Sequence, residues 1–108
     1  NKGIDVASGK WLNFMNGGDE FYDNKVIENI FKNCSYEDEY VIHGKVALIY
    51  KNDLIAYYGN TKIIPHQGAF FKTKIMKSLK FNTVYKIFAD GECLSRMQKL
   101  EKYKSKFI

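Results

Sequence analysis

The sequence lacks several features that mark specialised classes of protein. Its 108 residues include one proline and two cysteines, and Cys34 and Cys93 lie far apart in the chain with no CxxC pair. So few cysteines exclude a disulfide scaffold and a cysteine-based zinc site, and a reducing compartment is expected. No run of about 18 apolar residues is present, which excludes a helix that spans a membrane.

The residues that are present have the balance of a folded globular protein. Hydrophobic residues make up 45% of the chain and aromatic residues 16%, which is too much apolar character for a disordered segment. The length suits one domain or a part of one. Because no repeat, low-complexity tract or linker divides the chain, residues 1–108 are expected to form a single domain or a part of one.

The charge is distributed unevenly along the chain. Residues 1–54 carry six Lys and nine acids, a balance of −3, whereas residues 55–108 carry ten Lys and one Arg against three acids, a balance of +8. A basic half can attract nucleic acid, anionic lipid or a phosphorylated small molecule. It can equally be a solvated lysine-rich surface, and the sequence leaves these alternatives open.

Hydrophobic periodicity predicts strands that alternate with helices, and therefore an α/β fold. The apolar run at 11–15 predicts a strand buried on both faces, as in parallel sheets. Asp23 is expected to cap a helix whose apolar stripe is Val26, Ile27, Ile30 and Phe31. Further strands are expected at 40–43, 46–50, 54–58 and 69–71, and helices at 73–79 and from about Asp90, the last with a buried stripe of Cys93, Leu94, Met97 and Leu100.

A polar loop, Asn16 to Glu20, follows the strand predicted at 11–15. In open α/β sheets ligands bind beyond the carboxyl ends of the strands, and Gly17 and Gly18 let a backbone approach a ligand closely. Asp19 and Glu20 supply the oxygen ligands that magnesium or manganese prefers, usually together with substrate phosphates. The alternative is a tight turn in which Asp19 bonds only backbone N–H groups.

Two further positions carry chemistry that the sequence alone does not settle. Asp90 precedes the terminal helix, where a carboxylate serves either as a general base or as a simple N-cap. His66 and Gln67 follow Pro65 at the start of a strand, where a lone histidine is more often a hydrogen-bonded structural residue than a ligand. His43, inside a strand pattern, is expected to be structural.

Five segments in order resemble the second half of the catalytic domain of family 2 glycosyltransferases, the inverting GT-A type. The likeness is closest to bacterial enzymes that build cell-surface polysaccharides. Residues 14–19 resemble the DxD region in the variant that opens with asparagine, and residues 64–70 resemble a proline-histidine-glutamine segment of this subgroup. Residues 86–96 resemble the stretch that ends in an alanine-aspartate motif. Residues 1–12 resemble the helix and strand before the DxD region, and residues 38–44 the next strand and glycine.

The resemblance implies a fold, an activity and a set of site residues. The fold would be α/β, a partial GT-A (Rossmann-like) mixed sheet with flanking helices, in which the N-terminal nucleotide-binding half is missing. The intact enzyme would transfer a sugar with inversion from a nucleotide-sugar, expected to be a UDP-sugar, to a polysaccharide or lipid-linked acceptor. Asp19 would hold a divalent cation (Mg or Mn), and Asp90, with Glu92 as the alternative, would be the base. Donor and acceptor contacts would come from Asn16, Gly18, His66 and Gln67.

The resemblance also implies a setting for the protein. A cytoplasmic location is expected, with peripheral contact at the inner face of the membrane. The fragment alone is expected to be inactive and to form a homodimer through its exposed sheet edge. No nucleic-acid partner is expected, and the competing hypothesis is a non-catalytic basic module that binds nucleic acid.

Overall fold

The computed structural model describes residues 1–15, 17–32, 36–59, 64–85 and 89–108. The first elements along the chain are α1 (Lys2–Val6), β1 (Trp11–Leu12), α2 (Val26–Phe31), β2 (Val41–His43), β3 (Val46–Tyr50) and β4 (Asp53–Tyr58). They are followed by η1 (His66–Gly68), a short 3₁₀ helix, and by β5 (Ala69–Lys72), α3 (Thr73–Leu79), α4 (Ala89–Gln98) and β6 (Ser105–Phe107).

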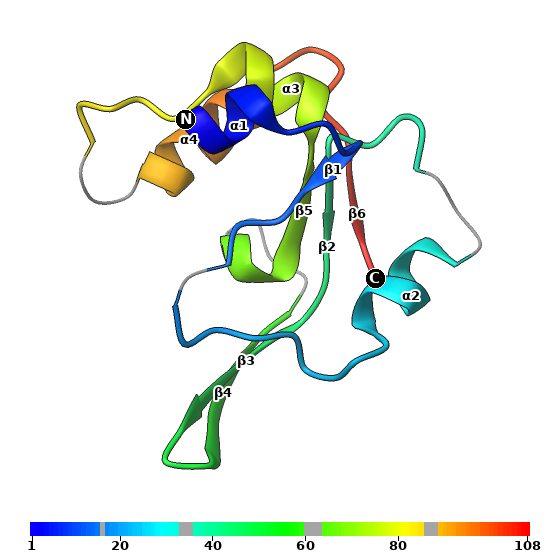
Figure 1. The fold of residues 1–108 in the computed structure, drawn as a ribbon, viewed down its shortest axis with the longest axis vertical. Coiled ribbons are helices and arrows are strands. Elements are labelled where there is room, and N and C mark those ends of the chain that lie inside the picture. Colours follow the sequence, from blue (N-terminus) through cyan, green and yellow to red (C-terminus); the bar gives the residue numbers. More distant parts are fainter. Residues whose placement is uncertain (16, 33–35, 60–63, 86–88) are drawn as a thin grey trace.

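A four-stranded mixed sheet organises the chain, with the strand order β1-β5-β2-β6. β5 runs antiparallel to both β1 and β2, whereas β6 runs parallel to β2. Helices flank this sheet (Figure 1). The prediction of an α/β chain with a mixed sheet and flanking helices is therefore confirmed.

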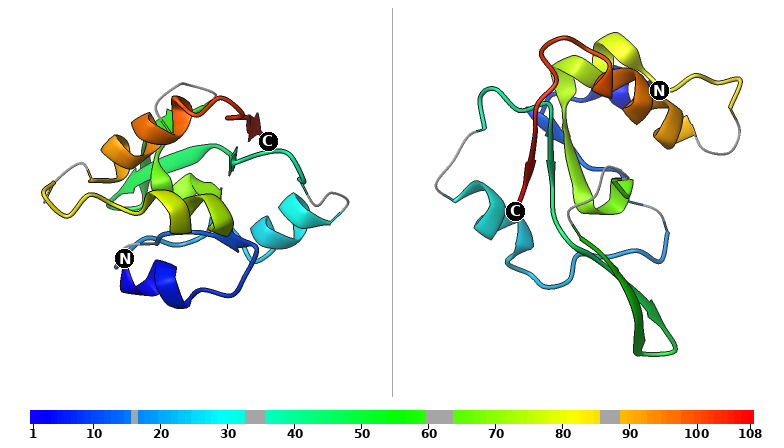
Figure 2. Two further views of the ribbon diagram at one scale, coloured as in Figure 1. Left: turned by 90° about the horizontal axis from the view of Figure 1, so that it is seen from above. Right: turned by 180° about the vertical axis from the view of Figure 1, so that it is seen from behind.

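One face of the sheet carries the main hydrophobic core. Val41 and Phe71 lie opposite each other on β2 and β5, and both belong to this core. Helix α3 contacts both α1 and α4, and the three helices gather at one end of the sheet (Figures 1 and 2). The buried members of the core are Ile4, Val41, Ile64, Ala69, Phe71, Met76, Cys93, Leu94 and Met97.

The opposite face of the sheet is covered by aromatic side chains from the segment around α2. Phe70 alternates with Phe71 along β5 and so points to the other side. Its ring meets the ring of Phe31 edge to face at 5.3 Å and stacks on Phe21 at 6.4 Å. Trp11 of β1 packs against Phe31 at 6.3 Å. Apolar layers on both faces make this sheet the centre of the molecule.

Strands β3 and β4 form a separate two-stranded sheet. This hairpin projects from the end of the molecule opposite α1, α3 and α4 (Figures 1 and 2). Lys51 and Asn52 adopt positive φ values of 50° and 65°, as a tight hairpin turn of the I′ type requires. The hairpin therefore projects away from the four-stranded sheet.

The structure corrects the prediction for the strand at 11–15. β1 contains only Trp11 and Leu12, is half-buried, and pairs antiparallel with β5 at the edge of the four-stranded sheet. It is neither a parallel strand nor buried on both faces. The strand ends where Asn13 directs its side-chain amide to two backbone carbonyls, described below.

Two helix predictions also need correction. α2 begins at Val26 after Lys25, and Asp23 accepts a hydrogen bond from the backbone N–H of Lys25 instead of capping the helix. Ile27 is 48% exposed, so the stripe of α2 is narrower than expected. Leu100 lies beyond the end of α4 and is exposed as well. The other predicted strands and helices are present within one or two residues, whereas β6 was not predicted.

Among the described residues, no helix has the length and apolar character that crossing a membrane requires.

Candidate active site

The helical turn η1 lies where the predicted site residues meet. Pro65 precedes it in an extended conformation, and the N–H of Gly68 closes the turn on the carbonyl of Pro65 at 3.1 Å. His66 and Gln67 are consecutive residues of this turn. Their side chains bond two carboxylates that come from distant parts of the chain.

Gln67 bonds the carboxylate of the loop that follows β1. Its Nε2 donates to Oδ2 of Asp19 at 3.2 Å. Asp19 and Glu20 are both exposed, and Gly18 turns the loop with a φ of 87°, a conformation that glycine adopts readily. A side chain of η1 is therefore a hydrogen-bond partner of Asp19, which the tight-turn alternative did not include.

His66 bonds the other predicted carboxylate. The distance from its Nδ1 to Oδ2 of Asp90 is 2.9 Å, and the side chains are 20% and 46% exposed. Asp90 lies in the first turn of α4 (Ala89–Gln98). A carboxylate in the first turn of a helix is also favoured by the helix dipole.

Glu92, the alternative candidate for the base, has a different environment. The guanidinium Nε of Arg96 donates to both oxygens of Glu92, at 2.9 and 2.6 Å. Arg96 also donates to the carbonyls of Leu79 and Lys80 at 3.0 and 2.6 Å. Glu92 therefore belongs to an ion pair that joins α4 to the end of α3, and Asp90 is the carboxylate on the side of His66.

Two residues that fix η1 in place, Asn13 and Gly68, were not among the predicted site residues. The side-chain amide of Asn13 donates to the carbonyls of Gln67 and Ala69, at 3.2 and 2.8 Å. A Cβ at Gly68 would collide with Cγ2 of Val46 and would lie 3.4 Å from the carbonyl oxygen of Gly44. The one usable signal was that Asn13 is the only polar residue in the run from Trp11 to Met15.

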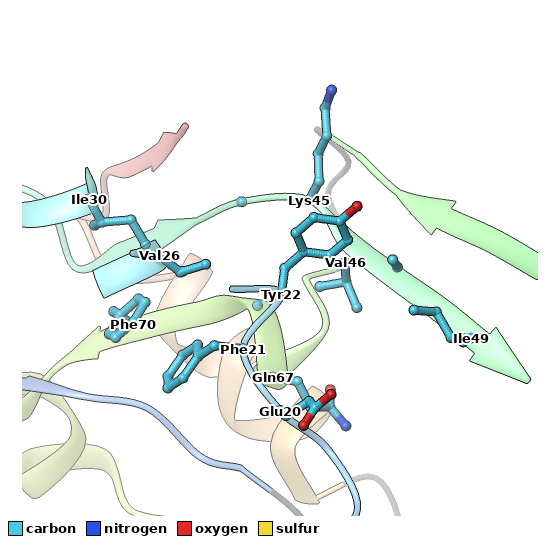
Figure 3. A pocket seen from close by; sticks show the side chains of 13 residues that line it. Glu20, Phe21, Tyr22, Val26, Ile30, Lys45, Val46, Ile49, Gln67 and Phe70 are labelled. Atoms are coloured by element: carbon cyan, nitrogen blue, oxygen red, sulfur yellow. The ribbon is translucent and has the colours of Figure 1, made fainter. Parts of the chain in front are cut away.

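A groove of about 550 Å³ opens beside the site, between the loop after β1 and the start of the hairpin. Gln67 and Glu20 lie at one margin of it, and Tyr22 and Val46 lie along its length (Figure 3). Asp90 does not line this groove. It lines, with His66, a separate cavity of about 10 Å³, which is too small for any substrate. η1 thus stands between the groove and Asp90.

Two other reactive side chains are structural. Burial lowers the pKa of His43, whose ring meets Phe107 of β6 at 5.3 Å. Burial also raises the pKa of the Cys93 thiol in the core, and a thiol held protonated in this way is a poor nucleophile.

The charge asymmetry of the sequence is partly compensated in the fold. Lys80 pairs with Asp5 at 2.7 Å, and Lys104 lies 4.0 Å from Glu39. Each pair joins a lysine of the basic half to an acid of the acidic half. Such surface pairs add little to stability, but they reduce the positive field of residues 55–108.

The donor set suits a cation that is shared with a substrate. Within the parts of the chain that are described, no three His, Cys, Asp or Glu side chains are grouped to hold a metal ion by themselves. Magnesium and manganese are commonly held by one or two carboxylates together with substrate phosphate oxygens. Asp19, exposed and next to Glu20, fits this second arrangement. Asn16, the remaining predicted contact residue, lies outside the described residues.

Comparisons with known proteins found no match for this chain among protein-family models, curated proteins or solved structures.

Proposed function

We propose that this chain is the second half of the catalytic domain of an inverting family 2 glycosyltransferase of the GT-A type. The proposal rests mainly on one observation, the junction at η1. Residues chosen from three separate segments of the sequence meet there, since Asp19 bonds Gln67 and Asp90 bonds His66. This meeting of residues from separate segments is what supports the proposal.

Asp90 is the base of the proposed reaction. It accepts the proton of the acceptor hydroxyl, whose oxygen attacks the anomeric carbon of the donor sugar. The bond from that carbon to the nucleoside diphosphate breaks on the opposite face, so the configuration inverts. A carboxylate that is about half exposed can meet an incoming hydroxyl while His66 holds one of its oxygens.

Asp19 is the residue that would hold the divalent cation, together with phosphate oxygens of the donor. A bound cation would neutralise the charge of the departing diphosphate. Gly18, which has no side chain at the turn of the loop, lets the donor approach the backbone there. The lysines of the basic half would attract the same diphosphate, or an anionic lipid-linked acceptor.

The test uses the full-length product of the gene that encodes this chain, a panel of UDP-sugars and a readout of UDP release. Asp90→Asn keeps the size of the side chain and an acceptor oxygen for His66 but cannot take up the proton. It should lose roughly 100-fold or more in turnover with an unchanged melting temperature. Glu92→Gln is the matched control. Because Glu92 bonds Arg96, this variant should have a lower melting temperature but a turnover near that of the wild type.

The metal carboxylate is tested in the same assay. Asp19→Ala should abolish metal-dependent transfer, whereas Glu20→Ala, one residue along the same exposed loop, should have a milder effect. Full activity of Asp19→Ala would contradict the assignment of the metal site. A wild-type protein that neither binds nor consumes any nucleotide-sugar would contradict the proposed function itself.

A further inference from the structure

We infer that η1 positions the two carboxylates of the site independently, through two side chains that are here called its arms, His66 and Gln67. In this inference, which rests on the proposed function, His66 positions Asp90 and Gln67 positions Asp19. Both residues act through a carboxylate, so they are positioning residues for the transfer reaction. The resemblance alone suggested only that they contact the donor or the acceptor.

The contacts that hold η1 in place suit it to positioning the two carboxylates. Pro65 fixes the entry to the turn, and the Asn13 amide holds the backbone on either side of Gly68 through the carbonyls of Gln67 and Ala69. The N–H of Gly44 donates to the carbonyl of Gly68 at 3.0 Å. The turn is therefore tied to the segment after β1 and to the end of β2. A side chain that projects from such a support loses little precision to backbone motion.

The arm formed by His66 controls which oxygen of Asp90 remains available. With Nδ1–H directed at Oδ2, Oδ1 is the oxygen that would receive the proton from the acceptor hydroxyl. His66 is the less exposed partner of the two, so it anchors the carboxylate that is more open to solvent. Loss of this bond would let Asp90 rotate, and the productive orientation would become one of several.

The arm formed by Gln67 does the same for Asp19. A carboxylate accepts hydrogen bonds but donates none, and the Gln67 amide donates to Oδ2. Because this bond engages Oδ2, Oδ1 is the oxygen that would contact a cation. Replacement of a residue that holds a metal ligand in this way commonly weakens metal affinity by about 10- to 100-fold.

The test distinguishes the effect of His66 from that of Gln67 by two measurements on the full-length gene product. One is turnover at saturating UDP-sugar and Mn²⁺, and the other is the dissociation constant for Mn²⁺ in the presence of UDP, followed by electron paramagnetic resonance. His66→Leu removes the hydrogen bond, whereas His66→Asn is the matched control, because the Asn amide nitrogen takes nearly the position of Nδ1. Gln67→Leu removes the other arm.

We expect the two arms to affect different quantities. His66→Leu should lower turnover by about 10-fold or more with unchanged Mn²⁺ affinity, and His66→Asn should restore most of the turnover. Gln67→Leu should weaken Mn²⁺ binding by about 10-fold and leave turnover at saturating Mn²⁺ near the wild-type value. Melting temperatures of all variants identify any loss that comes from unfolding.

Three outcomes would overturn the inference while leaving the proposed function intact. In the first, His66→Asn is as inactive as His66→Leu although both are folded, which would place the imidazole itself in contact with a substrate. In the second, Gln67→Leu changes KM for the UDP-sugar and not the affinity for Mn²⁺. In the third, both leucine variants behave as wild type. If the wild-type protein neither binds Mn²⁺ with UDP nor transfers sugar, the proposed function fails as well.

Discussion

The four-stranded sheet with α1, α3 and α4, here called the body, and the β3–β4 hairpin contain similar residues but bury them to very different extents. In the body, Val41 and Ile42 are completely buried. In the hairpin, Leu48 is 48% exposed and Tyr50 is 61% exposed. All four lie in paired strands, so strand pairing alone does not account for the difference.

The difference lies in what covers the strands. The body has helices on one face and the aromatic residues around α2 on the other, whereas the outer part of the hairpin projects away from both layers (Figure 1). A two-stranded hairpin without a covering layer is marginally stable in water. The two regions meet at η1, so the carboxylates lie at the border between a well-packed part and a weakly packed part of the molecule.

The largest expected effect comes from removing a core side chain of the body. Met97 of α4 is completely buried in the core, and Met97→Ala should lower the free energy of unfolding by about 2–5 kcal/mol. Leu54→Ala on the exposed hairpin is the control and should change it by less than about 0.5 kcal/mol. Urea unfolding measures both. Equal losses would show that the hairpin is packed in solution as tightly as the body.

A smaller effect is expected at the border between the two regions. Gly68→Ala introduces a Cβ that collides with Val46, and overpacking of this kind costs about 1–3 kcal/mol. Gly59→Ala is the matched control beyond the other end of the hairpin, because a Cβ there meets no atom of the described residues within 4 Å. Thermal unfolding should separate the two variants. If both melt like the wild type, Val46 moves freely, and η1 is less firmly held than its contacts indicate.

The smallest expected effect is a pH dependence at the end of β2. Because burial lowers the pKa of His43, the unfolded chain takes up a proton more readily than the folded one, and stability falls as the pH drops below about 6.5. His43→Phe should reduce this loss of stability between about pH 7 and pH 5. Urea unfolding at a series of pH values measures it. Identical pH profiles would indicate that His43 is solvated in the folded protein and not buried at the end of β2.

The sequence predicted the elements whose signal is local. The apolar spacing of Cys93, Leu94 and Met97 predicted α4, and the runs at 46–50 and 69–71 predicted β3 and β5. The strand at Trp11 was placed wrongly because its neighbour, β5, lies far away in the sequence, and no local pattern states whether a strand is central or at an edge. β6 was missed because Ser105 and Lys106 are polar, and it is held in the sheet by pairing with β2, a strand far away in the sequence.

The candidate site was predictable as a set of residues but not as an arrangement. Asp19, His66, Gln67 and Asp90 were chosen from motif-like positions, and their chemical roles remain predictions. Their pairing depends on where three separate segments lie in the fold, which no spacing in the sequence states. The part played by Asn13 was hidden for the same reason, since its two acceptors are backbone carbonyls and leave no trace in the sequence.

The strand order has a consequence for the speed of folding. Val41 pairs with Phe71 on one side and with Ser105 on the other, so the central strand finds both neighbours only after long segments of chain have closed into loops. Closing such loops slows the search for the native state. The β3–β4 hairpin pairs residues close in sequence, and hairpins of this kind form within about 1–10 μs. The less stable region therefore forms early, and the region that stabilises the molecule is completed last.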